Sequence, residues 1–129
     1  MQFNIIISGG PDGSQAAYSG NEFAKAVIAA GHTINQVFFY QNGVTQANEL
    51  VVPMADEYNA LEQWLALADN HAVPLVVCVS ASERRGIIDD SQMQEFQKTA
   101  TNLHPQFTVA GLGVMLEASL QSDRTVTFK

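Results

Sequence analysis

Cys78 is the only cysteine of the chain and the side chain best suited to covalent chemistry. A cysteine thiolate attacks a sulfane sulfur or a disulfide without the help of a general base. Arg84 and Arg85 follow in a polar segment and would favour the thiolate, as would the N–H groups of any helical turn that opens at Ser80 or Ser82. Glu83 would oppose it. Free cysteine is also among the most buried residue types. These residues therefore leave two interpretations open, a displayed nucleophile or an inert core side chain.

The three histidines, His32, His71 and His104, are candidate bases or metal ligands. Each precedes a predicted strand, which places it at the sheet edge opposite Cys78. A cysteine–histidine hydrolase needs the imidazole within hydrogen-bond reach of the sulfur, but each strand residue adds about 3.3 Å to their separation. We therefore expect neither a Cys–His pair nor a metal site within one chain. A single cysteine also excludes an internal disulfide and a Cys-x-x-Cys centre.

Two glycine-containing turns are the remaining candidates for binding. Residues 9–13 join the first predicted strand to a helix, where phosphate can bind, but they match no dinucleotide- or triphosphate-binding motif. A tight turn before Ser14, acting as an N-cap, is the simpler interpretation. Residues 111–113, Gly-Leu-Gly, are predicted at the same sheet edge as Cys78. Either the N–H groups of this segment face the sulfur, or its glycines merely permit the turn.

Apolar runs and helical periodicity alternate along the chain. The apolar runs predict strands at residues 2–8, 33–40, 74–79, 107–110 and 124–128. Helices are predicted at 14–30, where Gly31 ends the helix, and at 112–121. Another begins at Asp56 and continues through the periodic apolar positions Leu61, Trp64, Leu65 and Ala68. A fourth is predicted at 90–102, with Met93, Phe96 and Ala100 on one face.

This order predicts a three-layer α/β/α fold with a five-stranded parallel sheet, in a single domain over residues 1–129. The alternating residues of the last strand suit an edge position, and the earlier apolar strands suit burial on both faces. Ligands of such folds bind at the carboxyl ends of the strands. The loops at that edge are residues 9–13, 41–55, 80–89 and 110–113. Cys78 comes just before the third of them.

Composition limits the classes of partner. The net charge of −7 lacks the basic footprint that direct binding to nucleic acid needs. No apolar run approaches the roughly 20 residues of a membrane span, and the first residues have no signal-peptide pattern, so we expect a cytoplasmic protein. Only 15% of residues are charged, against about 25% in a typical soluble domain, which indicates that a partner covers part of the surface.

Motifs spread over the whole chain carry a family resemblance. They are the Gly-Pro turn after the first strand, Phe38-Phe39-Tyr40 with Gly43-Val44 and Ala47-Asn48, Cys78-Val79, Arg84-Arg85-Gly86, Phe107-Thr108, Gly111-Leu112-Gly113, Glu117-Ala118-Ser119-Leu120 and Asp123-Arg124. Each motif is weak alone. Their order and spacing resemble the DsrE/DsrF-like sulfur-carrier family and, within it, the TusD type of subunit in TusBCD sulfurtransferase complexes. The segment Ser80–Glu83 departs from close relatives in being more polar.

The resemblance implies that Cys78 accepts sulfur as a persulfide from a TusA-like donor and passes it to a TusE-like acceptor. The relay would end in the 2-thio group of the wobble uridine of tRNA, with no direct contact between this chain and nucleic acid. It also implies a heterohexamer with TusB-like and TusC-like subunits, and no cofactor. The absence of a second cysteine suits such a carrier, because a neighbouring thiol would discharge the persulfide as a disulfide.

Three other functions stay open at the level of sequence. The related DsrE role in dissimilatory sulfur oxidation uses the same scaffold and the same cysteine. A nucleotide- or flavin-binding module would use residues 9–14. A non-catalytic scaffold subunit would keep Cys78 inert.

Overall fold

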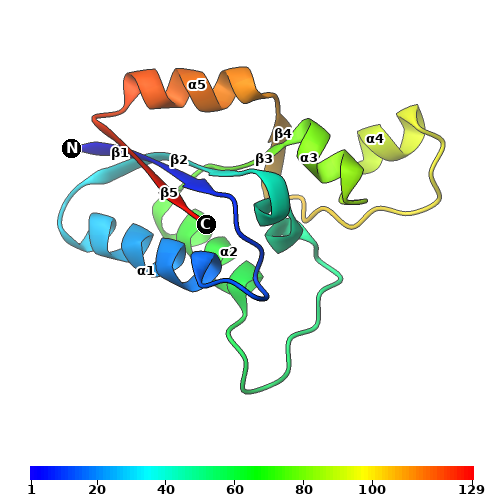
Figure 1. Ribbon diagram of the computed structural model, residues 1–129, viewed down its shortest axis with the longest axis horizontal. Helices are drawn as coiled ribbons and strands as arrows, with labels where there is room; N and C mark the ends of the chain where they lie inside the picture. Colours follow the sequence, from blue (N-terminus) through cyan, green and yellow to red (C-terminus); the bar gives the residue numbers. More distant parts are fainter.

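The computed structural model describes all of residues 1–129. Its centre is a five-stranded parallel sheet in the order β4-β3-β2-β1-β5, with helices on both faces (Figure 1). The strands are β1 (Gln2–Ile7), β2 (Thr33–Phe39), β3 (Leu75–Cys78), β4 (Phe107–Ala110) and β5 (Arg124–Phe128). The predicted α/β/α fold is confirmed, including the edge position of the last strand.

Helices cover both faces of this sheet and extend from one end of it. They are α1 (Ala16–Ala29), the 3-10 helix η1 (Gln41–Ala47), α2 (Ala60–His71), α3 (Val79–Arg84), α4 (Asp90–Glu95) and α5 (Leu112–Gln121). Figure 1 shows α1 and α2 on one face and α5 on the other, while α3 and α4 lie at one end of the molecule. None of these helices is both long and apolar enough to cross a membrane.

Aromatic packing builds the core between the sheet and the α1–α2 layer. Phe39 of β2 meets Trp64 of α2 and Phe107 of β4 edge-on, with ring centroids 5.2 and 5.3 Å apart. Gly20 of α1 lies where a Cβ would overlap the Ile7 side chain, so the glycine lets α1 approach β1 closely. Full burial of a large side chain such as Phe39 or Trp64 stabilises the fold by about 1.5–3 kcal/mol.

The sheet face beneath α5 is more polar. Asn4 and Gln36 are register partners on β1 and β2, and both are buried. Asn4 donates from Nδ2 to Ser119 Oγ of α5 at 2.9 Å, and Asn35 donates to Ser122 Oγ, just after that helix, at 3.2 Å. These hydrogen bonds add to the packing of Met115 and Ala118 in attaching α5 to the sheet.

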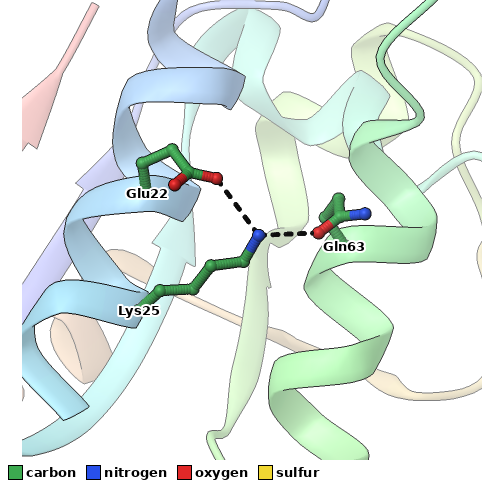
Figure 2. A network of polar contacts seen from close by, with 3 residues as sticks. All are labelled: Glu22, Lys25 and Gln63. Atoms are coloured by element: carbon green, nitrogen blue, oxygen red, sulfur yellow. Dashed lines mark hydrogen bonds and ion pairs between the residues drawn. The ribbon is translucent and has the colours of Figure 1, made fainter. Parts of the chain in front are cut away.

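A small polar network joins α1 to α2 at the surface. Lys25 Nζ of α1 lies 3.1 Å from Glu22 Oε1 and donates to Gln63 Oε1 of α2 at 2.8 Å (Figure 2). The Lys25 and Glu22 side chains are 42% and 46% exposed, so this ion pair contributes about 1 kcal/mol at most.

Two helices begin later than the sequence predicts. Ser14 is not the N-cap of α1; its Oγ accepts a hydrogen bond from the Ala16 N–H at 3.0 Å and so stabilises the turn before the helix. The α2 helix begins after Asn59, whose Oδ1 accepts from the Glu62 N–H at 3.1 Å. This cap leaves Asp56 in the preceding loop.

The helix predicted over residues 90–102 is much shorter than expected. It ends at Glu95, because Gln97 adopts a left-handed conformation with φ of 54° and the Lys98 N–H returns to the Met93 carbonyl at 2.8 Å. Conversely, η1 and α3 occupy segments that were predicted as loops.

Candidate functional site

Cys78 is the last residue of β3 and stands directly before α3. Its register partner is Ala110, the last residue of β4. The preceding residue, Val77, is the register partner of Phe39, whose ring packs against α2, so Val77 faces the α2 side of the sheet. Successive side chains of a strand point to opposite faces. Cys78 therefore points toward the α5 face, at the carboxyl edge of the sheet where the sequence places it.

The sulfur is not open to solvent in the single chain. Cys78 is 1% exposed and belongs to the buried apolar core. A thiol displayed at the rim of the sheet, one of the two interpretations that the sequence left open, is therefore wrong for the isolated chain. The reason is that β3 runs directly into α3, where an open polar loop was predicted.

One polar side chain reaches the sulfur. Ser80 Oγ lies 3.6 Å from Cys78 Sγ, and either atom can donate. Ser80 is exposed, in the first turn of α3, and its hydroxyl makes no other hydrogen bond. From the sequence, Ser80 is a possible start of a helical turn in an unusually polar segment, but not a side-chain partner of the sulfur.

The two arginines predicted to stabilise a thiolate do not bond to the sulfur. Arg85 donates through Nε to Asn42 Oδ1 at 2.9 Å and through Nη1 to the Ala81 carbonyl at 3.1 Å. It thereby ties the end of α3 to η1. Arg84 is exposed and makes no hydrogen bond or ion pair within the chain, which leaves its charge free for a partner.

The Gly-Leu-Gly turn lies next to Cys78 in the sheet. Gly111 follows Ala110, the register partner of the cysteine, and is the N-cap of α5. Neither Gly111 nor Gly113 has a positive φ, and a Cβ at either position would meet no atom within 4 Å. The fold of the single chain therefore requires neither glycine. No N–H group of the turn donates to the sulfur.

The three histidines make contacts of their own. His32 Nδ1 lies 3.0 Å from the amino group of Met1, and His104 Nδ1 accepts from the Gln106 N–H at 3.1 Å. His71 is the exposed last residue of α2. None of the three bonds to Cys78, and no group of three or more His, Cys, Asp or Glu residues is placed to hold a metal ion.

The turn that begins at Gly9 is filled by the protein itself. The buried Gln46 of η1 donates from Nε2 to the Gly9 carbonyl at 2.8 Å and accepts from Trp64 Nε1 at 2.7 Å. A Cβ at Gly9 would lie only 2.6 Å from Ser14 Oγ. Close packing thus accounts for this glycine, which favours a structural turn over a phosphate cradle. Sequence reasoning missed Gln46, because an amide in a polar segment carries no periodic signal.

The main surface hollows do not include the sulfur in their linings. The largest, of about 630 Å³, has Leu50, Phe96 and Lys98 in its lining. Another, of about 410 Å³, lies between the turn at Pro11 and Arg85. Cys78 lines neither hollow, so the site is a recessed sulfur and not a preformed pocket.

With this geometry in view, comparison with known proteins identifies the relatives of the chain. Residues 1–128 match the model of the DsrE/DsrF-like family. The chain belongs to the DsrE/DsrF-like family. The resemblance to this family, inferred from scattered motifs, is thereby confirmed.

Two relatives of this DsrE/DsrF-like protein are informative. It is 42% identical, over 128 residues, to a protein of Allochromatium vinosum described as "Putative sulfurtransferase DsrE". The matched region covers 99% of this chain and 98% of the relative. The crystal structure of the ychN protein from E. coli superposes with a TM-score of 0.76 over 99% of this chain and 100% of that one, at 21% identity. The second comparison supports the fold.

Proposed function

We propose that this DsrE/DsrF-like protein is a sulfurtransferase that carries sulfane sulfur as a persulfide on Cys78. The observation that supports it is the placement of the single cysteine at the carboxyl edge of the sheet, in a chain 42% identical to a relative named as a sulfurtransferase. Ligands of parallel α/β sheets bind at that edge. A thiolate there needs no histidine to attack sulfur.

Transfer consists of two displacements at sulfur. The Cys78 thiolate attacks the outer sulfur of a donor persulfide, the donor S–S bond breaks, and the donor leaves as a thiolate with the electron pair. The new S–S bond makes Cys78 a persulfide. A thiolate of the acceptor then attacks the outer sulfur, and Cys78 leaves as a thiolate. No external oxidant or reductant is needed, because one S–S bond breaks for each one formed.

The burial of Cys78 means that access must open during transfer. The element that follows the sulfur, α3, has only six residues, and helices this short depend on tertiary contacts for their stability. Local opening of such an element costs less free energy than global unfolding. We attribute access to movement of α3 when a donor or acceptor binds.

The outer surface of α5 supports an assembly with related subunits. Leu112, Leu116 and Leu120 repeat at every fourth residue and are 44%, 59% and 79% exposed. Val114, on the other flank of the helix, is 39% exposed. A helix normally turns its apolar stripe toward the core, but α5 turns Ser119 toward the sheet and leaves these leucines exposed. Permanent interfaces are more apolar than transient ones. We propose that TusB-like and TusC-like subunits of a heterohexamer cover this surface.

Two destinations for the sulfur are consistent with the family. The resemblance to TusD supports a cytoplasmic relay from a TusA-like donor to a TusE-like acceptor, for 2-thiolation of the tRNA wobble uridine. The relative named DsrE supports a carrier in dissimilatory sulfur oxidation at least as well. Deletion of the gene separates them: loss of 2-thiouridine supports the first, and loss of sulfur oxidation with normal 2-thiouridine supports the second.

A strain that carries Cys78→Ser tests the proposal in cells. We expect it to reproduce the defect of the deletion strain, because serine cannot form a persulfide while it preserves the size of the side chain. Normal sulfur metabolism in this strain, with the variant present at wild-type abundance, would contradict the proposal and favour a scaffold subunit with an inert cysteine.

A further inference from the structure

The exposed hydroxyl of Ser80 is the one polar side-chain group in contact with the Cys78 sulfur, at 3.6 Å. We propose that Ser80 donates a hydrogen bond that favours the thiolate of Cys78 and thereby sets how fast this sulfur reacts. The inference rests on the proposed function, in which the thiolate of Cys78 accepts sulfur. It adds to that function a role for the Ser80 hydroxyl that the sequence did not indicate.

Ser80 and Ser82 lie in the same short helix but differ in what their hydroxyls can do. Ser82 is buried, and its Oγ donates to the Val79 carbonyl at 2.9 Å. Ser80 has no such backbone partner. Its O–H is therefore free to turn toward the sulfur and donate to it, whereas that of Ser82 is engaged.

A buried thiolate needs a donor, because removal of an anion from water is costly unless hydrogen bonds compensate it. No other group supplies one within the chain. The neighbouring elements η1 and β4 carry no ionisable side chain. The charged or titratable groups in or next to the surrounding elements are Glu83 and Arg84 of α3, Arg85 just after it, Glu117 of α5 and Tyr40 just after β2. None of them bonds to the sulfur.

The hydroxyl acts without giving up its proton. During loading, the electron pair of the Cys78 thiolate forms the new S–S bond and the donor sulfur leaves with the pair of the broken bond. Ser80 holds the attacking sulfur in its anionic form before this step. The same hydrogen bond can then return when the acceptor removes the outer sulfur and Cys78 becomes a thiolate again.

Alkylation of Cys78 by iodoacetamide, measured across pH in the full chain, tests this role. We expect Ser80→Ala to react about tenfold more slowly than wild type near neutral pH, the effect of one hydrogen bond to a charged group. At a pH where the thiol is fully ionised, Ser80→Ala should react at least as fast as wild type, because a thiolate without that hydrogen bond is more nucleophilic. Ser80→Thr, which keeps the hydroxyl, should restore most of the rate, and Ser82→Ala should react like wild type.

Three results would overturn the inference. They are equal rates for Ser80→Ala and wild type at every pH, a slowing by the same factor at every pH, and no recovery in Ser80→Thr. A uniform slowing would mean that the side chain controls access and not charge. Failure of the proposed function looks different: wild type would alkylate at Cys78 yet gain no sulfur from a persulfide donor.

Discussion

At the scale of single residues, reaction at Cys78 depends on access as well as on charge. The sulfur is 1% exposed and has one polar contact, with Ser80. Arg84 and Arg85 follow in sequence, but the structure gives them different tasks. Arg85 joins α3 to η1, while Arg84 extends from the surface with no partner.

The two arginines are expected to differ in their effect on stability. Arg85→Ala removes hydrogen bonds to Asn42 and to the Ala81 carbonyl, and should lower the free energy of unfolding by about 1 kcal/mol. Arg84→Ala removes no side-chain hydrogen bond or ion pair and should change the free energy of unfolding by less than about 0.5 kcal/mol. Urea unfolding of both variants measures the difference. Equal losses, or a larger loss for Arg84→Ala, would refute these assignments.

The position of Cys78 could be predicted from sequence, but its surroundings could not. The alternation of apolar runs with helical segments is enough to place the end of β3 at the carboxyl edge of the sheet. Burial of the sulfur depends on α3, whose residues Val79–Arg84 carry no apolar repeat that would have predicted a helix. The contact with Ser80 follows from that helix, so it too required the structure.

At the scale of elements, regular segments with a clear apolar pattern were predicted well. The bounds of β4, α5 and β5 agree with those read from the sequence. Errors occur where a local backbone state decides the outcome. The left-handed Gln97 ends α4 early. The Asn102 side chain then accepts a hydrogen bond from the Ile88 N–H and donates one to the Gly86 carbonyl, which holds the segment after α4 in an irregular path. Such bonds leave no periodic trace in the sequence.

The contact between α1 and the loop before α2 is expected to make stability sensitive to alkaline pH. Burial, then the nearby Glu22 carboxylate and then Tyr18, raise the pKa of Tyr58 from 10.0 to about 12. The unfolded chain therefore loses this proton near pH 10 and the folded chain near pH 12. By linkage, the contribution of protonated Tyr58 to the free energy of unfolding is complete below pH 10 and falls as the pH rises toward 12.

Tyr58→Phe, which cannot ionise, isolates this contribution. Between pH 10 and pH 12 its free energy of unfolding should fall less steeply than that of wild type, while the edge-to-face contact with Tyr18 is retained. Urea unfolding at several pH values in this range measures both slopes. Parallel slopes for the two proteins would contradict the assignment.

At the scale of the whole molecule, the two sides of the sheet are built differently. The α1–α2 side buries the aromatic core, whereas the α5 side places polar residues on the sheet and leucines on the outer surface. The second arrangement suits a surface that another subunit covers. The low fraction of charged residues agrees with this interpretation.

Charged substitutions on α5 should separate assembly from folding. Leu116→Glu combined with Leu120→Glu places two carboxylates on the exposed stripe and should weaken association by at least about tenfold, because unpaired charges at an interface are costly to desolvate. The single chain should keep its melting temperature. Val52→Glu is the matched control, since Val52 is 88% exposed in the loop before α2. Sedimentation of the co-expressed subunits measures association, and equal behaviour of all variants would exclude α5 from the interface.

The intact mass of the chain after exposure to a low-molecular-weight persulfide tests most directly whether Cys78 carries sulfur. We predict a gain of one sulfur atom on wild type, its location on the peptide that contains Cys78, and its release by an added thiol. Cys78→Ser should gain nothing. An unchanged wild-type mass under conditions where Cys78 is alkylated, or an equal gain in Cys78→Ser, would contradict sulfur carriage by this residue.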